Sequence, residues 1–132
     1  APSQDALFAR SDVLSLHVKL TAETRGIVTA ADLARMKASA LLVNTSRAAL
    51  IAPGALEQAL RAGRPGAAAV DVFEAEPVVG AGHPLLALEN VIATPHLGYV
   101  EKDSYEAYFG EAFAQVAAFA RGAPTGVINP VM

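Results

Sequence analysis

The sequence predicts an α/β fold built around a parallel sheet. Short apolar runs alternate with segments of helical periodicity in the order strand, helix, strand, helix, strand, which is the rhythm of parallel α/β units. The runs are apolar throughout, as is typical of strands buried on both faces. Each run also ends in polar residues, which is what a binding edge of such a sheet requires.

The first half of the chain is expected to supply two strands with a short helix between them. Thr29 and Asp32 have the spacing of a capping box, so a helix should begin there, with Leu33 and Met36 on its apolar face. The expected elements, in order, are a short turn or helix in 1–10, a strand over 13–17, a loop over 19–26, this helix, and a strand over 40–43 that stops at 44–47.

The second half is expected to add a helix, two strands and a long closing helix. Pro53 suits the first turn of a helix that Gly63 ends. The later elements are a strand over 67–70, a surface loop over 78–86, a strand over 91–93, an amphipathic helix over 101–121 and a short tail over 127–130. The aromatic stripe of the last helix suggests core or a dimer surface.

Composition narrows the class of protein. With 132 residues the chain has the length of one domain, and its net charge of −3 with scattered Lys and Arg argues against a nucleic-acid surface. No apolar run approaches the roughly 20 residues needed to span a bilayer, and no signal peptide opens the chain. The absence of cysteine fits a reducing compartment, so we expect a cytoplasmic protein.

Polar residues follow all four predicted strands. They are His17, the segment 44–47, Asp71 and His96. Because the carboxyl ends of parallel strands share one edge, where ligands bind in open α/β sheets, we expect these residues to lie along one rim.

Arg47, Glu76 and His96 are the candidate reactive residues. The Arg47 guanidinium could clamp a carboxylate with two hydrogen bonds, or it could form a surface ion pair. His96 could exchange a proton near neutral pH, or it could simply cap a strand end. If Glu76 reaches the far ring nitrogen of His96, it fixes the tautomer and favours the charged ring.

Other residues give weaker signals. Asp71 could accept a hydrogen bond from a ligand or form a turn. His17 could line a ligand or end a strand, and His83 is expected to be solvated in a Gly-Pro loop. Three scattered histidines predict no metal site, and Ser46 lacks the G-x-S-x-G elbow of a serine hydrolase.

Three linked motifs resemble the NAD-dependent D-2-hydroxyacid dehydrogenases, which include phosphoglycerate dehydrogenase and glyoxylate/hydroxypyruvate reductase. The motifs are Asn44-Thr45-Ser46-Arg47-Ala48, Asp71-Val72-Phe73-Glu74-Ala75-Glu76-Pro77 and Thr94-Pro95-His96-Leu97-Gly98. The resemblance covers essentially the whole chain. It implies the second half of a Rossmann-type doubly wound parallel sheet plus a long C-terminal helix.

The resemblance also implies roles. Arg47 would hold the substrate carboxylate, His96 would be the acid/base paired with Glu76, and Asp71 would accept from the nicotinamide carboxamide of NAD, with NADP not excluded. The positions implied to line the cofactor are Val18, Thr45, Ser46, Arg47, Asp71, His96 and Gly98. The substrate would be a small 2-oxoacid or 2-hydroxyacid.

The chain departs from the family pattern in what it lacks. It has no G-x-G-x-x-G turn for a pyrophosphate and no separate substrate domain, so residues 1–132 are expected to form a single partial dinucleotide-binding domain. A half sheet would expose apolar surface, which predicts either a lost half or a homodimer that covers it.

Three hypotheses remain open. The chain could be a portion of a D-2-hydroxyacid dehydrogenase, with the isolated 132 residues expected to be inactive. It could be a naturally truncated, non-catalytic dimeric remnant. It could also be a relative that acts on formate or phosphite, or one that serves as a corepressor.

Overall fold

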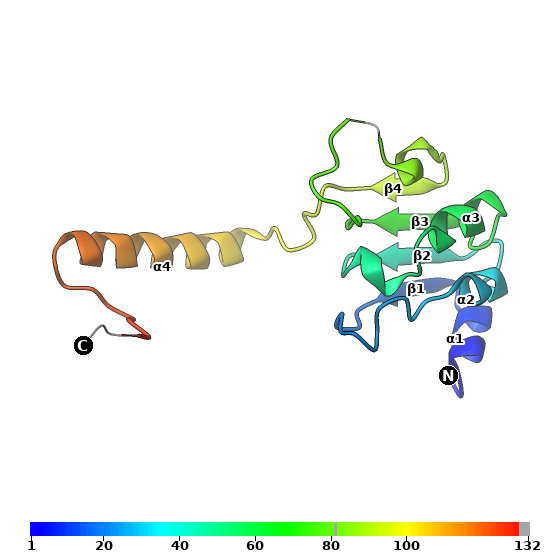
Figure 1. Cartoon of the computed structure of the whole chain (residues 1–132), viewed down its shortest axis with the longest axis horizontal. Helices are drawn as coiled ribbons and strands as arrows, with labels where there is room; N and C mark the ends of the chain where they lie inside the picture. The colour runs from blue at the N-terminus through cyan, green and yellow to red at the C-terminus, as the bar shows by residue number, and fades with distance from the viewer. Residues whose placement is uncertain (81, 130–132) are drawn as a thin grey trace. The chain divides into compact units, whose positions relative to one another are not determined.

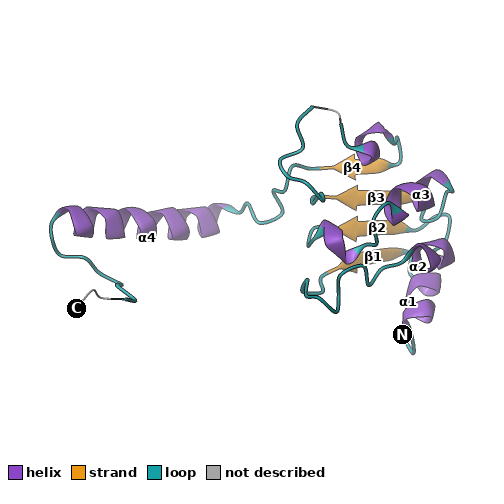
Figure 2. Cartoon of the chain, in the orientation of Figure 1, coloured by secondary structure: helices purple, strands orange, loops and turns teal. Residues whose placement is uncertain are grey.

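The computed structural model describes residues 1–80 and 82–129, and it divides into two units, residues 1–98 and residues 99–132 (Figure 1). The first unit contains the sheet and the short helices, and the second contains one long helix (Figure 2). The elements of the first unit are α1 (Gln4–Arg10), β1 (Val13–Leu16), α2 (Ala30–Arg35), β2 (Leu41–Asn44), η1 (Ala48–Leu50), α3 (Ala55–Arg61), β3 (Ala67–Val70), η2 (Pro84–Ala87) and β4 (Val91–Ala93).

The four strands form one parallel sheet in the order β1-β2-β3-β4. Leu14 lies opposite Leu42 and Leu42 opposite Ala68, so these three side chains share one face. All four arrowheads point the same way in Figure 1, which places the carboxyl ends of the strands along one edge. The predicted parallel α/β sheet is therefore confirmed.

One face of the sheet carries the core of this unit. The buried strand residues contact apolar side chains of α1, α2 and α3, and the short helices stay ordered because each buries such a face. Leu33 and Leu42 are fully buried and Leu50 nearly so. The main members of this cluster are Phe8, Leu14, Leu16, Leu33, Leu42, Leu56, Leu60, Ala68 and Val70.

The opposite face of the sheet is much less covered. Ser15, Val43, Ala69 and Ile92 share this face by register. Val13, two residues before Ser15, is 62% exposed, and Ile92 is 71% exposed. The expectation of strands buried on both faces therefore holds on one face only.

The local signals for helix ends act as predicted at two positions. The Asp32 amide donates to Thr29 Oγ1 at 3.2 Å, and the Thr29 amide donates to Asp32 Oδ2 at 2.8 Å, which completes the capping box. Gly63 follows α3 with φ +78°, the left-handed conformation that favours glycine after a helix. Pro53, however, lies before the N-cap Gly54 and outside α3, because the chain turns at Gly54 with φ +71°.

Two further expectations need correction. The strand predicted over 13–17 ends at Leu16, and the one predicted over 40–43 runs from Leu41 to Asn44, because Asn44 continues the ladder opposite Leu16. The loop over 78–86 contains the start of η2, since His83 Nδ1 accepts from the Leu85 amide at 3.3 Å.

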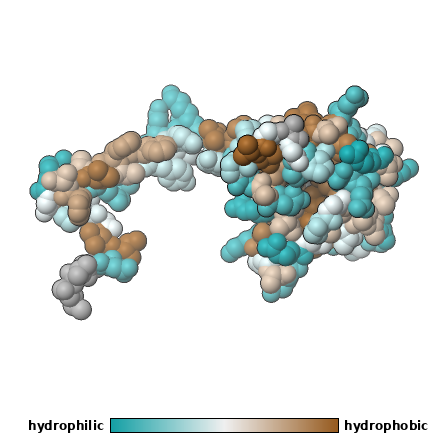
Figure 3. All heavy atoms as spheres, turned by 45° about the horizontal axis from the view of Figure 1, so that its top comes forward, coloured by the Kyte–Doolittle hydropathy of each residue, from teal (hydrophilic) through white to brown (hydrophobic). Residues whose placement is uncertain are grey.

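The second unit is built on α4 (Lys102–Ala120). Glu101 caps it by accepting from the Asp103 and Ser104 amides at 3.0 and 2.8 Å, and Gly122 follows it with φ +70°. Its aromatic stripe, which is exposed in this unit, consists of Tyr105, Tyr108, Phe109, Phe113 and Phe119. Figure 3 shows brown, hydrophobic atoms on the surface of this helix. Of the predicted tail, Pro130 lies outside the described residues.

No described helix combines the length and apolar character that crossing a membrane requires.

Candidate functional site

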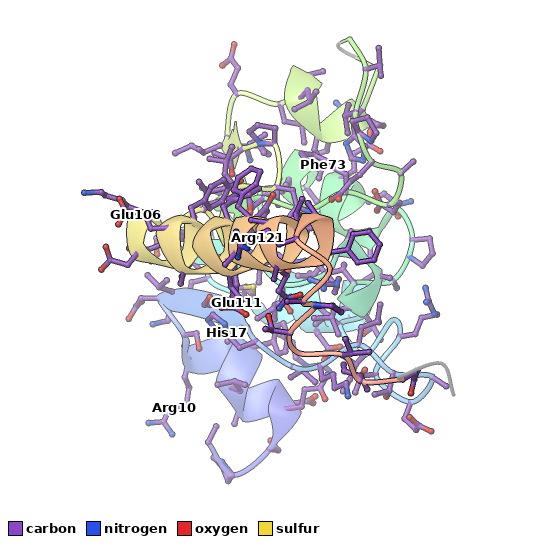
Figure 4. All side chains as sticks on the ribbon, turned by 90° about the vertical axis from the view of Figure 1, so that its left-hand side faces the viewer. Arg10, His17, Phe73, Glu106, Glu111 and Arg121 are labelled. Atoms are coloured by element: carbon purple, nitrogen blue, oxygen red, sulfur yellow. The ribbon has the colours of Figure 1, made fainter. Side chains whose placement is uncertain are left out.

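The candidate site lies at the carboxyl edge of the sheet, which Figure 4 views end-on with His17 and Phe73 labelled. His17 directly follows β1, and Thr45 directly follows β2. Asp71 directly follows β3, and Thr94 directly follows β4. Sheet topology alone therefore brings segments that are far apart in the sequence to one rim.

Glu76 and His96 are in contact, although 20 residues separate them. His96 Nδ1 lies 2.6 Å from Glu76 Oε2, and the Phe73 amide donates to Glu76 Oε1 at 2.8 Å. The hydrogen bond with His96 and then that from Phe73 lower the pKa of Glu76 below its usual value, against a small opposing effect of burial. Glu76 is thus kept as a carboxylate that accepts from the ring.

Asp71 is a buried carboxylate, only 2% exposed, that holds the turn containing His96. Its Oδ1 accepts from the Thr94 hydroxyl and, at 2.8 Å, from the Leu97 amide, and its Oδ2 accepts from the Gly98 amide at 2.7 Å. Burial raises the pKa of Asp71, but these hydrogen bonds and the charge of His96 outweigh it and lower the pKa.

Asn44, at the end of the neighbouring strand β2, has a similar role. It is 1% exposed, its side-chain amide donates to the Arg47 carbonyl at 3.0 Å, and its Oδ1 accepts from the Ser46 amide at 3.1 Å. These bonds fold residues 44–47 into a turn that presents Thr45 and Arg47 outward. Ser46 Oγ lies 3.5 Å from the Val18 carbonyl, so the loop after β1 borders this turn.

Arg47 is exposed at the same rim. Its Nη1 donates to the Ser46 carbonyl at 2.6 Å, and its charge contributes to the low pKa of Glu76. Arg47 is an exposed cation that follows the strand next to the one preceding Glu76, and a guanidinium has several donors that can bind a planar anion. The three candidate reactive residues therefore share one rim.

Sequence reasoning missed several partners in the first unit. His83 is half-buried, contrary to the expected solvated residue, and its Nε2 lies 2.9 Å from Glu74 Oε2. His17 Nε2 lies 2.8 Å from Ser15 Oγ, within its own strand end. The carboxylates in 71–76 lie close enough in the sequence to His83 to indicate a contact with it. The fold is needed to show that Glu74 contacts His83 and that Glu76 contacts His96.

The Asp71 carboxylate at this edge has one acceptor position beyond those that its protein donors use. A carboxylate has about four lone-pair positions, and protein donors use three of those on Asp71, which leaves one on Oδ2 for a ligand amide. Gly98 lacks a side chain beside that oxygen. In the described residues of the chain no three His, Asp or Glu side chains are placed to hold a metal ion.

Comparison with known proteins identifies the family. Residues 1–98 match the model of the D-isomer specific 2-hydroxyacid dehydrogenase NAD-binding domain. The glyoxylate reductase of Aeropyrum pernix is 41% identical over 128 residues, which cover 96% of this chain and 38% of that protein. The chain thus spans about two fifths of the length of this relative.

Solved structures that resemble this chain belong to the same family. A protein from Ralstonia solanacearum assigned as a D-3-phosphoglycerate dehydrogenase is 56% identical with a TM-score of 0.87, covering 98% of this chain and 38% of its own. A D-isomer specific 2-hydroxyacid dehydrogenase from Xanthobacter autotrophicus, crystallised with NADPH and MES, is 33% identical with a TM-score of 0.69, covering 98% and 51%. The chain therefore belongs to the NAD-dependent D-2-hydroxyacid dehydrogenase family, and its Rossmann-like sheet lies within that family's NAD-binding domain.

Proposed function

We propose that this chain carries the catalytic groups of an enzyme that reduces a 2-oxoacid to a 2-hydroxyacid with NADH, and runs the reverse reaction with NAD. The observation that carries the proposal is the contact between His96 Nδ1 and Glu76 Oε2 at 2.6 Å, beside the charge of Arg47. A positioned proton donor next to a fixed cation is what reduction of a carbonyl beside a carboxylate requires.

Each residue has one role in this proposal. Arg47 binds the substrate carboxylate through the parallel donors of its guanidinium, and this orients the neighbouring carbonyl. His96, oriented through Nδ1 by Glu76, gives the proton on Nε2 to the carbonyl oxygen. Bound NADH supplies the hydride to the carbonyl carbon, so the products are the hydroxyacid, NAD⁺ and a neutral imidazole that water reprotonates.

The cofactor-lining roles belong to the same proposal. Asp71 would accept from the carboxamide with its remaining lone pair, while Val18, Thr45, Ser46 and Gly98 border the nicotinamide. The presence of NAD or NADPH in the family fits either cofactor.

The test is NADH oxidation with a panel of 2-oxoacids, measured on the longest natural polypeptide that contains this chain. His96→Ala should lower kcat/KM by about 100- to 10,000-fold, the usual range for an acid/base group. Arg47→Ala should raise KM for the oxoacid by a larger factor than it changes the Kd for NADH. If both variants kept wild-type kcat/KM, the proposed roles would be wrong.

A further inference from the structure

The turn over 94–98 places His96 in an unusual backbone conformation. Among the non-glycine residues that the structure describes, His96 alone has a positive φ, at +56°. Side chains with a Cβ avoid this left-handed region unless the surroundings hold them there. The His96 amide donates to the Thr94 carbonyl at 3.0 Å, but this bond ends at His96 and does not fix Leu97 or Gly98.

Asp71 holds the turn on both sides of His96. Two residues before the histidine it accepts from the Thr94 hydroxyl, and after it from the Leu97 and Gly98 amides at 2.8 and 2.7 Å. Because Asp71 is buried, water cannot readily replace a donor that is lost. The Thr94 hydroxyl is the only side-chain donor among these three bonds, so it is the one that a substitution can remove.

Gly98 leaves room for the same carboxylate. A Cβ at this position would lie 2.9 Å from Asp71 Oδ2, closer than real Cβ atoms approach other atoms. Gly98 is not among the glycines with positive φ, so its backbone would accept alanine. The need for glycine arises from the position of Asp71.

Both partners of the Glu76–His96 pair are fixed from the carboxyl end of β3. Asp71 holds the His96 turn, and the amide of Phe73, two residues later, holds Glu76. We propose that Thr94 is a positioning residue for His96, acting through Asp71, and that Gly98 is glycine because a side chain there would displace the same carboxylate. This proposal rests on the proposed function for the catalytic importance of His96.

Thr94→Val is the decisive variant, and Thr94→Ser is its matched control. Valine keeps the shape and removes the hydroxyl, whereas serine keeps the hydroxyl. In the 132-residue chain, without substrate or cofactor, Thr94→Val should speed hydrogen exchange of the Leu97 and Gly98 amides at least about tenfold. It should also raise the pKa of Glu76 toward its usual value, because the bond with His96 is the largest cause that lowers it. Thr94→Ser should leave both at wild-type values.

A second pair of variants tests Gly98. Gly98→Ala should act like Thr94→Val, whereas Gly110→Ala, at a helical glycine whose added Cβ would have no atom within 4 Å, should change neither readout. If Thr94→Val unfolds the chain, Gly98→Ala decides by the same two measurements. If either folded variant lowers the Tm but leaves the Glu76 pKa and the two exchange rates unchanged, the residue is merely structural and the proposal is wrong.

The activity assay separates this proposal from the proposed function. Thr94→Val should lower kcat more than it changes KM, since it misplaces the proton donor and leaves Arg47 in place. If the Glu76 pKa moves in Thr94→Val but no 2-oxoacid is reduced by the wild-type protein, the proposed function fails and the positioning role stands. If reduction occurs and Thr94→Val matches wild type in kcat and in Glu76 pKa, the positioning role fails alone.

Discussion

At the scale of single residues, the first unit contains two acid–imidazole pairs that look alike in sequence. Glu76 meets His96 at 2.6 Å, and Glu74 meets His83 at 2.9 Å. In the first pair the charge of Arg47 contributes to the low pKa of Glu76. His83 instead caps η2 through Nδ1, which gives it a structural role in the loop.

The two glutamates therefore form a matched test. Glu76→Gln should reduce kcat/KM by about 10- to 100-fold, less than the loss of the acid itself, because glutamine can still contact the ring but lacks the carboxylate that accepts from Nδ1 and orients the ring. Glu74→Gln should leave kcat/KM unchanged. Steady-state kinetics of 2-oxoacid reduction measures both, and equal losses in the two variants would contradict the assignment of Glu76.

Asp71 should make the stability of the chain depend on pH. Its pKa is lower in the folded state, so its contribution is fully present above the unfolded-state pKa of about 3.9 and is lost as pH falls through the folded value. Asp71→Asn should destabilise the chain by about 2 kcal/mol at pH 7, because the Leu97 and Gly98 amides lose an ionised acceptor at a buried position. It should also flatten the loss of stability below about pH 4.

Urea denaturation at several pH values measures this effect. Asp5→Asn is the control, since it removes the same charge from a side chain that is 65% exposed in its ion pair with Arg35. A pH profile that stays the same in Asp71→Asn would show that Asp71 does not carry the dependence.

At the scale of elements, the sequence predicted the strands better than the contacts between their ends. The strands over 67–70 and 91–93 have the predicted bounds because each is an apolar run flanked by glycine or polar residues. The capping box at Thr29 could also be predicted from the sequence, since its two partners are three residues apart. Such signals are local, so one sequence is enough.

The contacts that could not be predicted join residues that are distant in the chain. Nothing near Asp71 in sequence indicates that its donors are Thr94, Leu97 and Gly98, between 23 and 27 residues away. The sequence shows Asn44 only as part of the polar segment 44–47, and its burial results from the position of β2 inside the sheet. The family resemblance supplied the roles of Arg47, Glu76 and His96, and these roles still await the experiments above.

The close approach of two backbone segments before β2 and β3 gives a prediction for an element. A Cβ at Gly66 would lie 1.9 Å from the Ala38 carbonyl oxygen, which belongs to backbone and cannot move aside as a side chain could. Gly66→Ala should therefore destabilise the first unit by about 3 kcal/mol.

Thermal denaturation followed by circular dichroism measures the loss of stability in Gly66→Ala. Gly82→Ala is the control, because the nearest atom to its added Cβ would be 3.8 Å away. If Gly66→Ala melted with the wild-type chain, the β2 and β3 amino ends would have to lie farther apart than the structure shows.

At the scale of the whole molecule, the exposed face of the sheet is the feature that needs explanation. Val13 and Ile92, on opposite edge strands, are 62% and 71% exposed. Apolar surface of this kind drives association in water. We therefore expect the 132-residue chain to cover this face by pairing with a second copy.

Light scattering over a range of concentrations tests this proposal. The wild-type chain should self-associate, and the double variant Val13→Lys/Ile92→Lys should shift toward the monomer. Val79→Lys, at a residue that is 85% exposed in the loop between β3 and η2, should behave as wild type. A monodisperse wild-type monomer at every concentration would contradict the proposal.

The rim contains two kinds of residue: buried side chains that hold its turns, which are Asn44 and Asp71, and exposed side chains that those turns carry. Both are buried at the ends of the two central strands, whereas Thr45 projects from a turn that the Asn44 side chain holds. A substitution at Thr45 should therefore leave the bonds that hold this turn in place, whereas one at Asn44 would remove them. Among related proteins, Thr45 should therefore vary more often than Asn44 and Asp71.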